Sequence, residues 1–200
     1  MAAEAADKVQ RHARIDRWFH WVTAVAMTAL LVTGLMPIVG IHIPWVEVHS
    51  QAGLLLTAVV LLHIVRAVFV QGLRPMSLRI RDLRELSGAR PGKYSLPQKL
   101  MHLGWAVTVL AAIGTGILLL KKAGAPFIVR DPYVFELKTW GLLTVLHDLA
   151  TLLAVFLILV HVYFGLLPEK RMYLRSMVRG WVTRKELDAH HDPERVARGE

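Results

Sequence analysis

The sequence contains no cysteine among its 200 residues. This absence excludes disulfide bonds, iron–sulfur clusters ligated by this chain and any cofactor attached through a thiol. Acidic side chains are also scarce within its long apolar stretches, where Asp148 is the clearest one. A membrane protein that uses histidines as a proton relay would need acidic partners there, so a non-redox protein of that kind is only a distant alternative.

Apolar residues make up 54% of the chain, and its mean hydropathy is +0.44. Both values indicate an integral membrane protein. Each apolar stretch is close to the roughly 20 residues that a membrane-spanning helix needs. The four stretches cover residues 18–40, 50–70, 100–120 and 142–167.

We therefore expect an all-α membrane protein built as a four-transmembrane-helix bundle. Its parts would be an N-terminal segment at 1–17, a membrane domain at 18–167 and a polar tail at 168–200, with a short surface helix near 173–187. The N-terminus has no apolar core of its own, so we expect no cleavable signal peptide.

The net charge of +9 follows from membrane topology rather than from nucleic-acid binding, because no stacking aromatics are interleaved with the basic residues. Nineteen Lys and Arg residues lie in 1–17, 71–99 and 168–200, against four in 121–141 and none in 41–49. The positive-inside rule then places both termini and the middle connection in the cytoplasm.

Two histidines, His147 and His161, lie fourteen residues apart in the fourth apolar stretch. On a helix this spacing is about four turns, short by roughly 40°, with a rise of about 21 Å. One helix face would carry an imidazole near each side of the membrane. The two rings would be too far apart to bind the same metal ion, because a metal lies only about 2 Å from each nitrogen that ligates it. Polar groups at this depth mark function by default. Haem iron, bound without a covalent link by imidazoles from two helices, is the economical interpretation.

The expected depth of the other histidines in the membrane indicates which of them would pair with His147 and which with His161. His49 opens the second stretch on the outer side and would pair with His147, and His20 lies at the cytoplasmic end of the first and would pair with His161. His63, however, lies fourteen residues after His49 and near the depth of His161. Geometry alone leaves both His20 and His63 open as the inner ligand.

Other residues suit a flat, bulky ligand with acidic substituents. Small residues let a macrocycle approach the backbone, although they also let helices pack closely. Arginines near the inner end could pair with haem propionates, although Arg66 could instead snorkel to the interface. The glycines are Gly34, Gly53, Gly114 and Gly116, and the arginines are Arg14, Arg17 and Arg66.

Residues 14–21 (Arg-Ile-Asp-Arg-Trp-Phe-His-Trp), together with His49, His147 and His161, resemble the prokaryotic di-haem cytochrome b family. That family includes the membrane subunits of respiratory formate dehydrogenases and nickel–iron hydrogenases. The formate dehydrogenase gamma subunit is the most similar branch, and the resemblance covers roughly residues 11 to 193. Its loop and tail motifs are residues 92–99, Thr115-Gly116, residues 176–180 and His190-His191.

The resemblance implies two haem b groups, one ligated by His20 and His161 and the other by His49 and His147. It favours His20 over His63, because His63 is not part of the formate-branch pattern.

It also implies a menaquinone or ubiquinone pocket beside the inner haem, formed by Tyr94, Ser95 and Gln98 with His161 adjacent. Ser95 stands where the family pattern has asparagine and Pro97 where it has glycine, so we expect the hydrogen bonds and backbone of this pocket to differ.

By the same resemblance, the chain would lie in the bacterial inner membrane as the cytochrome b subunit of a formate dehydrogenase. It would carry electrons from a periplasmic iron–sulfur beta subunit to quinone near the cytoplasmic side. A separate molybdenum or tungsten subunit would oxidise formate, so this chain would not be the formate-oxidising subunit. The alternatives are a nickel–iron hydrogenase cytochrome b subunit and a stand-alone di-haem quinone oxidoreductase.

Overall fold

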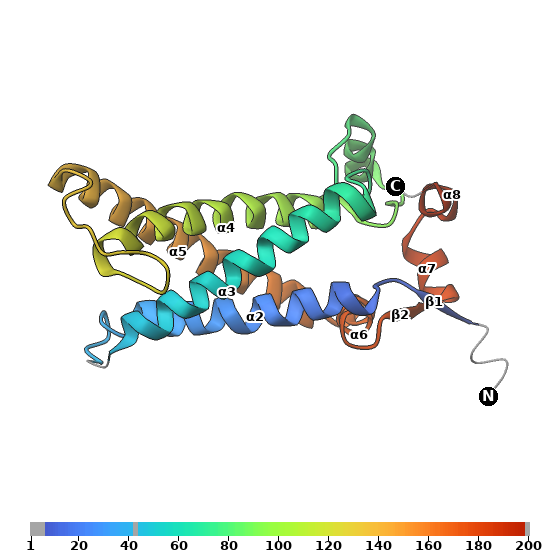
Figure 1. Cartoon of the computed structure of the whole chain (residues 1–200). Helices are drawn as coiled ribbons and strands as arrows, with labels where there is room; N and C mark the ends of the chain where they lie inside the picture. Colours follow the sequence, from blue (N-terminus) through green and yellow to red (C-terminus); the bar gives the residue numbers. More distant parts are fainter. Residues whose placement is uncertain (1–6, 42–43, 199–200) are drawn as a thin grey trace. The chain divides into compact units, whose positions relative to one another are not determined.

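The computed structural model describes residues 7–41 and 44–198, and its helices dominate the chain (Figure 1). Two short strands, three short non-α helices and seven α-helices are formed within these residues. In chain order they are β1 (Lys8–Gln10), α2 (Arg14–Leu35), α3 (Trp45–Arg66), the π-helical turn η1 (Ala67–Gln71), the 3-10 helix η2 (Ile80–Ser87), α4 (Leu96–Ala123), α5 (Leu137–Leu166), the 3-10 turn η3 (Pro168–Lys170), α6 (Arg171–Arg179), β2 (Trp181–Thr183), α7 (Arg184–His190) and α8 (Pro193–Ala197).

Four helices are long and apolar enough to cross a membrane, as the hydropathy of the sequence predicts. They are α2 with 22 residues, α3 continued through η1 with 27, α4 with 28 and α5 with 30. At most 17% of the residues in each apolar window are buried within the chain, as expected for helices surrounded by lipid. The protein is therefore a multi-pass membrane protein.

The four long helices begin earlier than the apolar stretches do, and in α2 and α4 a polar side chain caps the first turn. The Asp16 carboxylate accepts a hydrogen bond from the backbone N–H of Ala13 at 3.1 Å, which lets α2 begin at Arg14 rather than at residue 18. The second span begins at Trp45, directly after Pro44, so His49 lies one turn inside α3 and not at its start.

The chain forms two compact units. The helical unit comprises residues 19–64 and 105–158, and its core takes at least one buried side chain from each of the four long helices. These core residues are Ala26 and Met27 on α2, Leu56 on α3, Val109 on α4 and Ala154 on α5. Small side chains on α2 and α5 let the backbones approach closely, which is how helices associate in membranes.

The terminal unit comprises residues 1–18, 65–104 and 159–200. Its strands β1 and β2 pair antiparallel, with Val9 opposite the fully buried Val182. The chain just after β1 continues this connection, because the backbone N–H of Arg11 donates to the carbonyl of Gly180 at 2.9 Å. The described part of the polar tail, residues 168–198, thus folds into the 3-10 turn η3, three α-helices and a strand, where the sequence predicts only one short surface helix.

Candidate functional site

The imidazoles of His49 on α3 and His147 on α5 face each other within the helical unit. Their ring centres lie 6.2 Å apart, with 72° between the ring planes. A metal ion bound between two imidazoles lies about 2 Å from each nitrogen, and each ring centre lies about 1 Å further out, so the centres would be about 6 Å apart. The observed separation therefore fits one metal atom ligated axially by both histidines.

The protonation pattern of His49 is set by Thr33 on α2. The Thr33 Oγ1 lies 2.6 Å from the carbonyl oxygen of Ala29, so its one hydroxyl proton is donated to that carbonyl. The same oxygen lies 2.9 Å from Nδ1 of His49, and it must accept there. His49 therefore carries its proton on Nδ1 and presents the lone pair of Nε2, the form that ligates a metal.

His147 has the same arrangement on the other pair of helices. The Thr115 Oγ1 on α4 lies 2.7 Å from the carbonyl oxygen of Ala111 and 2.9 Å from Nδ1 of His147. The threonine again donates to its own helix and accepts from the imidazole. In both facing histidines a threonine hydroxyl thus engages Nδ1 and leaves Nε2 as the nitrogen that could ligate a metal.

A glycine follows each of these threonines and makes room for the ring. A Cβ added at Gly34 would lie 3.3 Å from Cε1 of His49, and one at Gly116 would lie 3.2 Å from Cε1 of His147. Such distances are too short for the rings to stay in place. Gly34 and Gly116 therefore lie directly against the two imidazoles. A Cβ at Gly53 would meet Leu30 at 3.8 Å, and one at Gly114 would meet no protein atom within 4 Å. The role of the four glycines toward a flat ligand stays a prediction.

Across residues 7–41 and 44–198, no group of three or more His, Asp or Glu side chains could hold a bare metal ion. A tetrahedral zinc site needs such a group. Two opposed imidazoles suffice only where the remaining metal positions are filled by a macrocycle, as in a haem.

The sequence independently matches a family model described as prokaryotic cytochrome b561, over residues 11–180. The chain belongs to the prokaryotic cytochrome b561 family. It is therefore a membrane cytochrome b, an electron-transfer protein that binds b-type haem. No curated protein matches it.

Two histidines predicted for the inner site of this cytochrome b, His63 and His20, contact neighbouring aromatic rings. His63 stacks on Phe19, with ring centres 4.1 Å apart and 18° between planes, so one face of its imidazole is covered. His20 contacts Trp21 edge-on at 5.0 Å. Both belong to the helical unit, whereas His161 belongs to the terminal unit. The pairing of His161 with His20 stays a prediction.

Two of the three arginines predicted for the haem propionates, Arg17 and Arg66, have protein partners in the terminal unit. Arg66 forms an ion pair with Asp16, which also accepts a hydrogen bond from the Gln71 side chain at 2.8 Å. Arg17 donates to the carbonyl of Val178 at 2.6 Å. Because a guanidinium has five N–H groups, each arginine keeps donors beyond these contacts. Their role toward propionates stays a prediction.

The predicted quinone residues lie at the start of α4, where two of them cap the helix. The side-chain oxygen of Gln98 accepts from the backbone N–H of Ser95 at 3.0 Å, as in a capping box. Pro97 fits the first helical turn, where no backbone N–H is needed, which accounts for its departure from the family pattern. The side-chain oxygen of Gln98 therefore already accepts a hydrogen bond. Its side-chain N–H groups would be the donors for a quinone.

Tyr94 lies just before this cap among cationic groups. Its ring lies 5.7 Å from the guanidinium of Arg11 and 5.4 Å from the ammonium of Lys93. Burial raises the pKa of the Tyr94 phenol above its ordinary value, so the phenol stays protonated and can act as a hydrogen-bond donor.

One histidine that the sequence marks only as part of a motif has a structural role. His191 is completely buried in the terminal unit, and its Nδ1 donates to the carbonyl of Gly92 at 2.5 Å. Its Nε2 lies 3.3 Å from an N–H of Arg11 and 3.2 Å from the hydroxyl of Tyr173, and it accepts from both. Burial is the main reason that the pKa of His191 falls to about 4. The neutral ring thus joins the N-terminal segment, the middle connection and the tail.

Proposed function

We propose that this cytochrome b is the membrane subunit of a respiratory formate dehydrogenase, passing electrons from a periplasmic iron–sulfur partner through two b haems to quinone near the cytoplasmic side. The observation that carries the proposal is the facing pair of His49 and His147, whose Nδ1 atoms each lie 2.9 Å from a threonine hydroxyl oxygen. This geometry supports one haem directly, and the spacing of His147 and His161 supports a second.

Each of the residues at this site would have its own role. His49 and His147 would hold the outer haem through two imidazole nitrogens, and ligation of this kind would favour electron transfer over oxygen binding. Thr33 and Thr115 orient the two rings. When bound, the haem supplies one-electron redox chemistry. His20 and His161 would hold the inner haem in the same way.

At the inner end, the buried phenol of Tyr94 and the amide of Gln98 would donate hydrogen bonds to a menaquinone or ubiquinone carbonyl, with Ser95 beside them. Arg17 and Arg66 would bind propionates through the N–H groups that do not donate to Val178 or to Asp16. The distribution of Lys and Arg supports placing this end and both termini in the cytoplasm, with the span in the bacterial inner membrane.

The electron donor is proposed from two features of the sequence. Because the chain has no cysteine, iron–sulfur clusters must belong to a partner, here the beta subunit of a complex whose catalytic subunit carries molybdenum or tungsten. The loop at 92–99 and the tail motif at 176–180 resemble the formate branch. A nickel–iron hydrogenase is the second candidate, because the short name of the matched family model refers to a nickel-hydrogenase cytochrome b.

Affinity purification of the tagged chain from its native membrane distinguishes the donors. A co-purifying molybdenum or tungsten subunit supports the formate assignment. A nickel–iron subunit replaces it with the hydrogenase assignment, and no redox partner at all supports the stand-alone oxidoreductase. The haem assignment does not depend on this result.

The haem assignment is tested with His147→Ala in the intact complex. We expect the variant to lose one haem per chain and all partner-driven haem reduction. His190→Ala is the matched control, because His190 is exposed and its Nδ1 lies 3.1 Å from the carbonyl oxygen of Glu186, on the short helix α7. Two retained haems that formate still reduces in His147→Ala would refute the assignment.

A further inference from the structure

The 3-10 helix η2 connects two membrane spans. The span formed by α3 and η1 ends at Gln71, η2 runs from Ile80 to Ser87, and α4 begins at Leu96. Only a short connection separates η2 from a span on each side. Within the terminal unit, η2 is therefore held close to the level at which these helices leave the membrane.

A 3-10 helix has three residues per turn, so residues three apart share a face. The first face of η2 carries Ile80, Leu83 and Leu86, which are 88%, 54% and 79% exposed. Three large aliphatic side chains thus line one side of a short helix without being covered by the rest of the terminal unit. In water, an exposed apolar stripe of this kind is unfavourable.

The second face carries Arg81 and Arg84, which line a pocket of about 300 Å³. Among the described residues that line this pocket, five are arginines and one is acidic. The others are Arg90, Arg195 and Arg198 with Ala89 and Asp192. The carboxylate of Asp192 accepts from the backbone N–H groups of Glu194 and Arg195, so it is occupied in capping α8.

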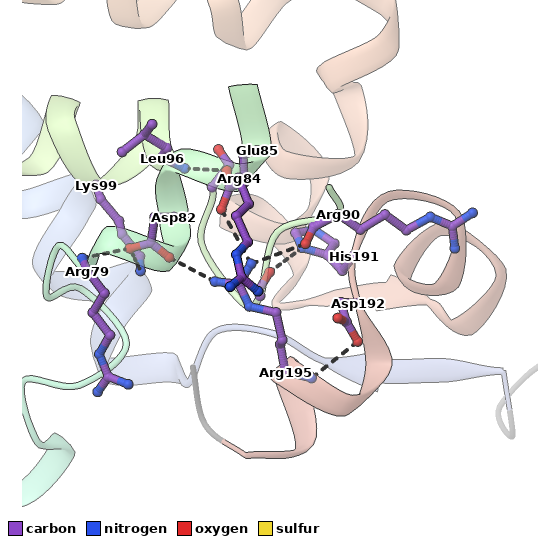
Figure 2. Close-up of polar contacts among 12 residues, drawn as sticks. Arg79, Asp82, Arg84, Glu85, Arg90, Leu96, Lys99, His191, Asp192 and Arg195 are labelled. Atoms are coloured by element: carbon purple, nitrogen blue, oxygen red, sulfur yellow. Dashed lines mark hydrogen bonds and ion pairs between the residues drawn. The ribbon is translucent and has the colours of Figure 1, made fainter. Parts of the chain in front are cut away.

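The third face of η2 points inward, and its contacts fix the orientation of the other two faces. Asp82 is fully buried and accepts from Lys99 and from Arg195, each at 2.8 Å, as Figure 2 shows. Glu85 accepts from the backbone N–H of Leu96 at 2.7 Å (Figure 2). These contacts tie η2 to the start of α4 and to α8. The helix cannot turn its aliphatic face inward without breaking them.

We propose that η2 is an interfacial helix that binds an anionic phospholipid, with its aliphatic face among the acyl chains and its arginine pocket on the headgroup phosphate. Guanidinium groups bind phosphate oxygens through paired N–H donors. An aliphatic face beside a cationic face, close to two spans, matches the boundary between acyl chains and anionic headgroups. A soluble phosphate would use the pocket but not the aliphatic face.

Two double variants separate these contributions. Arg81→Gln/Arg84→Gln removes the charge of the pocket, and Ile80→Ser/Leu86→Ser removes the two most exposed aliphatic side chains of η2. Arg171→Gln/Arg179→Gln is the matched control, because both of these arginines are exposed on α6 and do not line the pocket. The haem content of each purified variant verifies that it has folded.

The detergent-solubilised full chain is titrated with phosphatidylglycerol, and retained lipid is counted by native mass spectrometry. A basic residue near an anionic surface contributes roughly fivefold in affinity, so we expect the pocket variant to lose roughly 30-fold. The aliphatic variant should also lose affinity, whereas the α6 control should behave as the parent does. Phosphatidylcholine should be retained less than phosphatidylglycerol by the parent chain.

Three results would overturn the proposal. Displacement of the lipid by inorganic phosphate at equal concentration, with no effect of the aliphatic variant, would make this a site for a soluble anion. Normal lipid retention by both variants, with loss of a co-purifying subunit, would make it a protein-docking surface. Equal losses in the pocket and α6 variants would show that only overall charge matters.

Discussion

Replacing Thr33 or Thr115 by valine removes the hydroxyl that accepts the Nδ1–H of the facing histidine while keeping the size and branching of the side chain. Each of these hydrogen bonds is 2.9 Å long. A buried N–H left without an acceptor costs about 1–3 kcal/mol. This range agrees with the 10- to 100-fold loss of metal affinity that is typical when a residue supporting a ligand is removed.

We therefore expect each variant to bind the outer haem about 10- to 100-fold more weakly. We also expect its reduction potential to rise, because an imidazole that no longer donates from Nδ1 is a weaker base and stabilises the oxidised iron less. Haem transfer to an excess of apo-acceptor protein measures affinity, and a potentiometric titration of the reduced-band absorbance measures the potential.

The matched control is Thr28→Val on α2, since the Thr28 hydroxyl donates to the carbonyl of Ala24 at 2.8 Å and no contact with a histidine is formed. Thr151→Val is a second control, on α5, where the hydroxyl donates to the backbone carbonyl of His147 and not to its ring. If the Thr33 and Thr115 variants match these controls in both affinity and potential, the argument that threonine fixes the tautomer is wrong.

Three further changes have defined outcomes. Gly116→Ala should displace the facing imidazole and shift the low-spin electron paramagnetic resonance signal of the outer haem, whereas Gly114→Ala, with nothing within 4 Å, should leave that signal unchanged. Because the pKa of buried His191 is lowered to about 4, its neutral form stabilises the fold fully above about pH 6.5, and at most about 3 kcal/mol is lost as the pH falls toward 4. The protection factors for hydrogen exchange in the tail should fall over that range, and constant protection factors would contradict this role. Asp82→Asn should destabilise the terminal unit by about 3–5 kcal/mol, because it leaves the charge of buried Lys99 unpaired, and unchanged exchange at the start of α4 would refute this.

The four spans and the outer histidine pair could be predicted because both depend on periodic, local patterns. Hydropathy locates the spans, and a fourteen-residue spacing places His147 and His161 on one helix face. The same reasoning places Gly34 at the depth of the outer site. Helix ends could not be predicted in this way, because they depend on capping contacts such as the one that Gln98 makes to Ser95.

Of the two threonines that position the imidazoles, Thr115 was marked only as part of a family motif, and Thr33 was missed for a different reason. Thr33 lies in an apolar helix where its hydroxyl can always satisfy its own backbone, so nothing in the pattern separates it from Thr28. Its distinguishing contact is to His49, which lies on another helix. His191 was likewise hidden, because its partners Gly92 and Arg11 come from distant parts of the chain, and only folding brings them together.

The central claim is tested most directly by the haem-to-polypeptide ratio of the purified chain, measured together with its dithionite-reduced minus oxidised visible spectrum. We predict two b-type haems per chain with low-spin bands, as ligation by two imidazoles requires. A chain that binds no haem, or that shows only a high-spin spectrum, would contradict ligation of haem by His49 and His147.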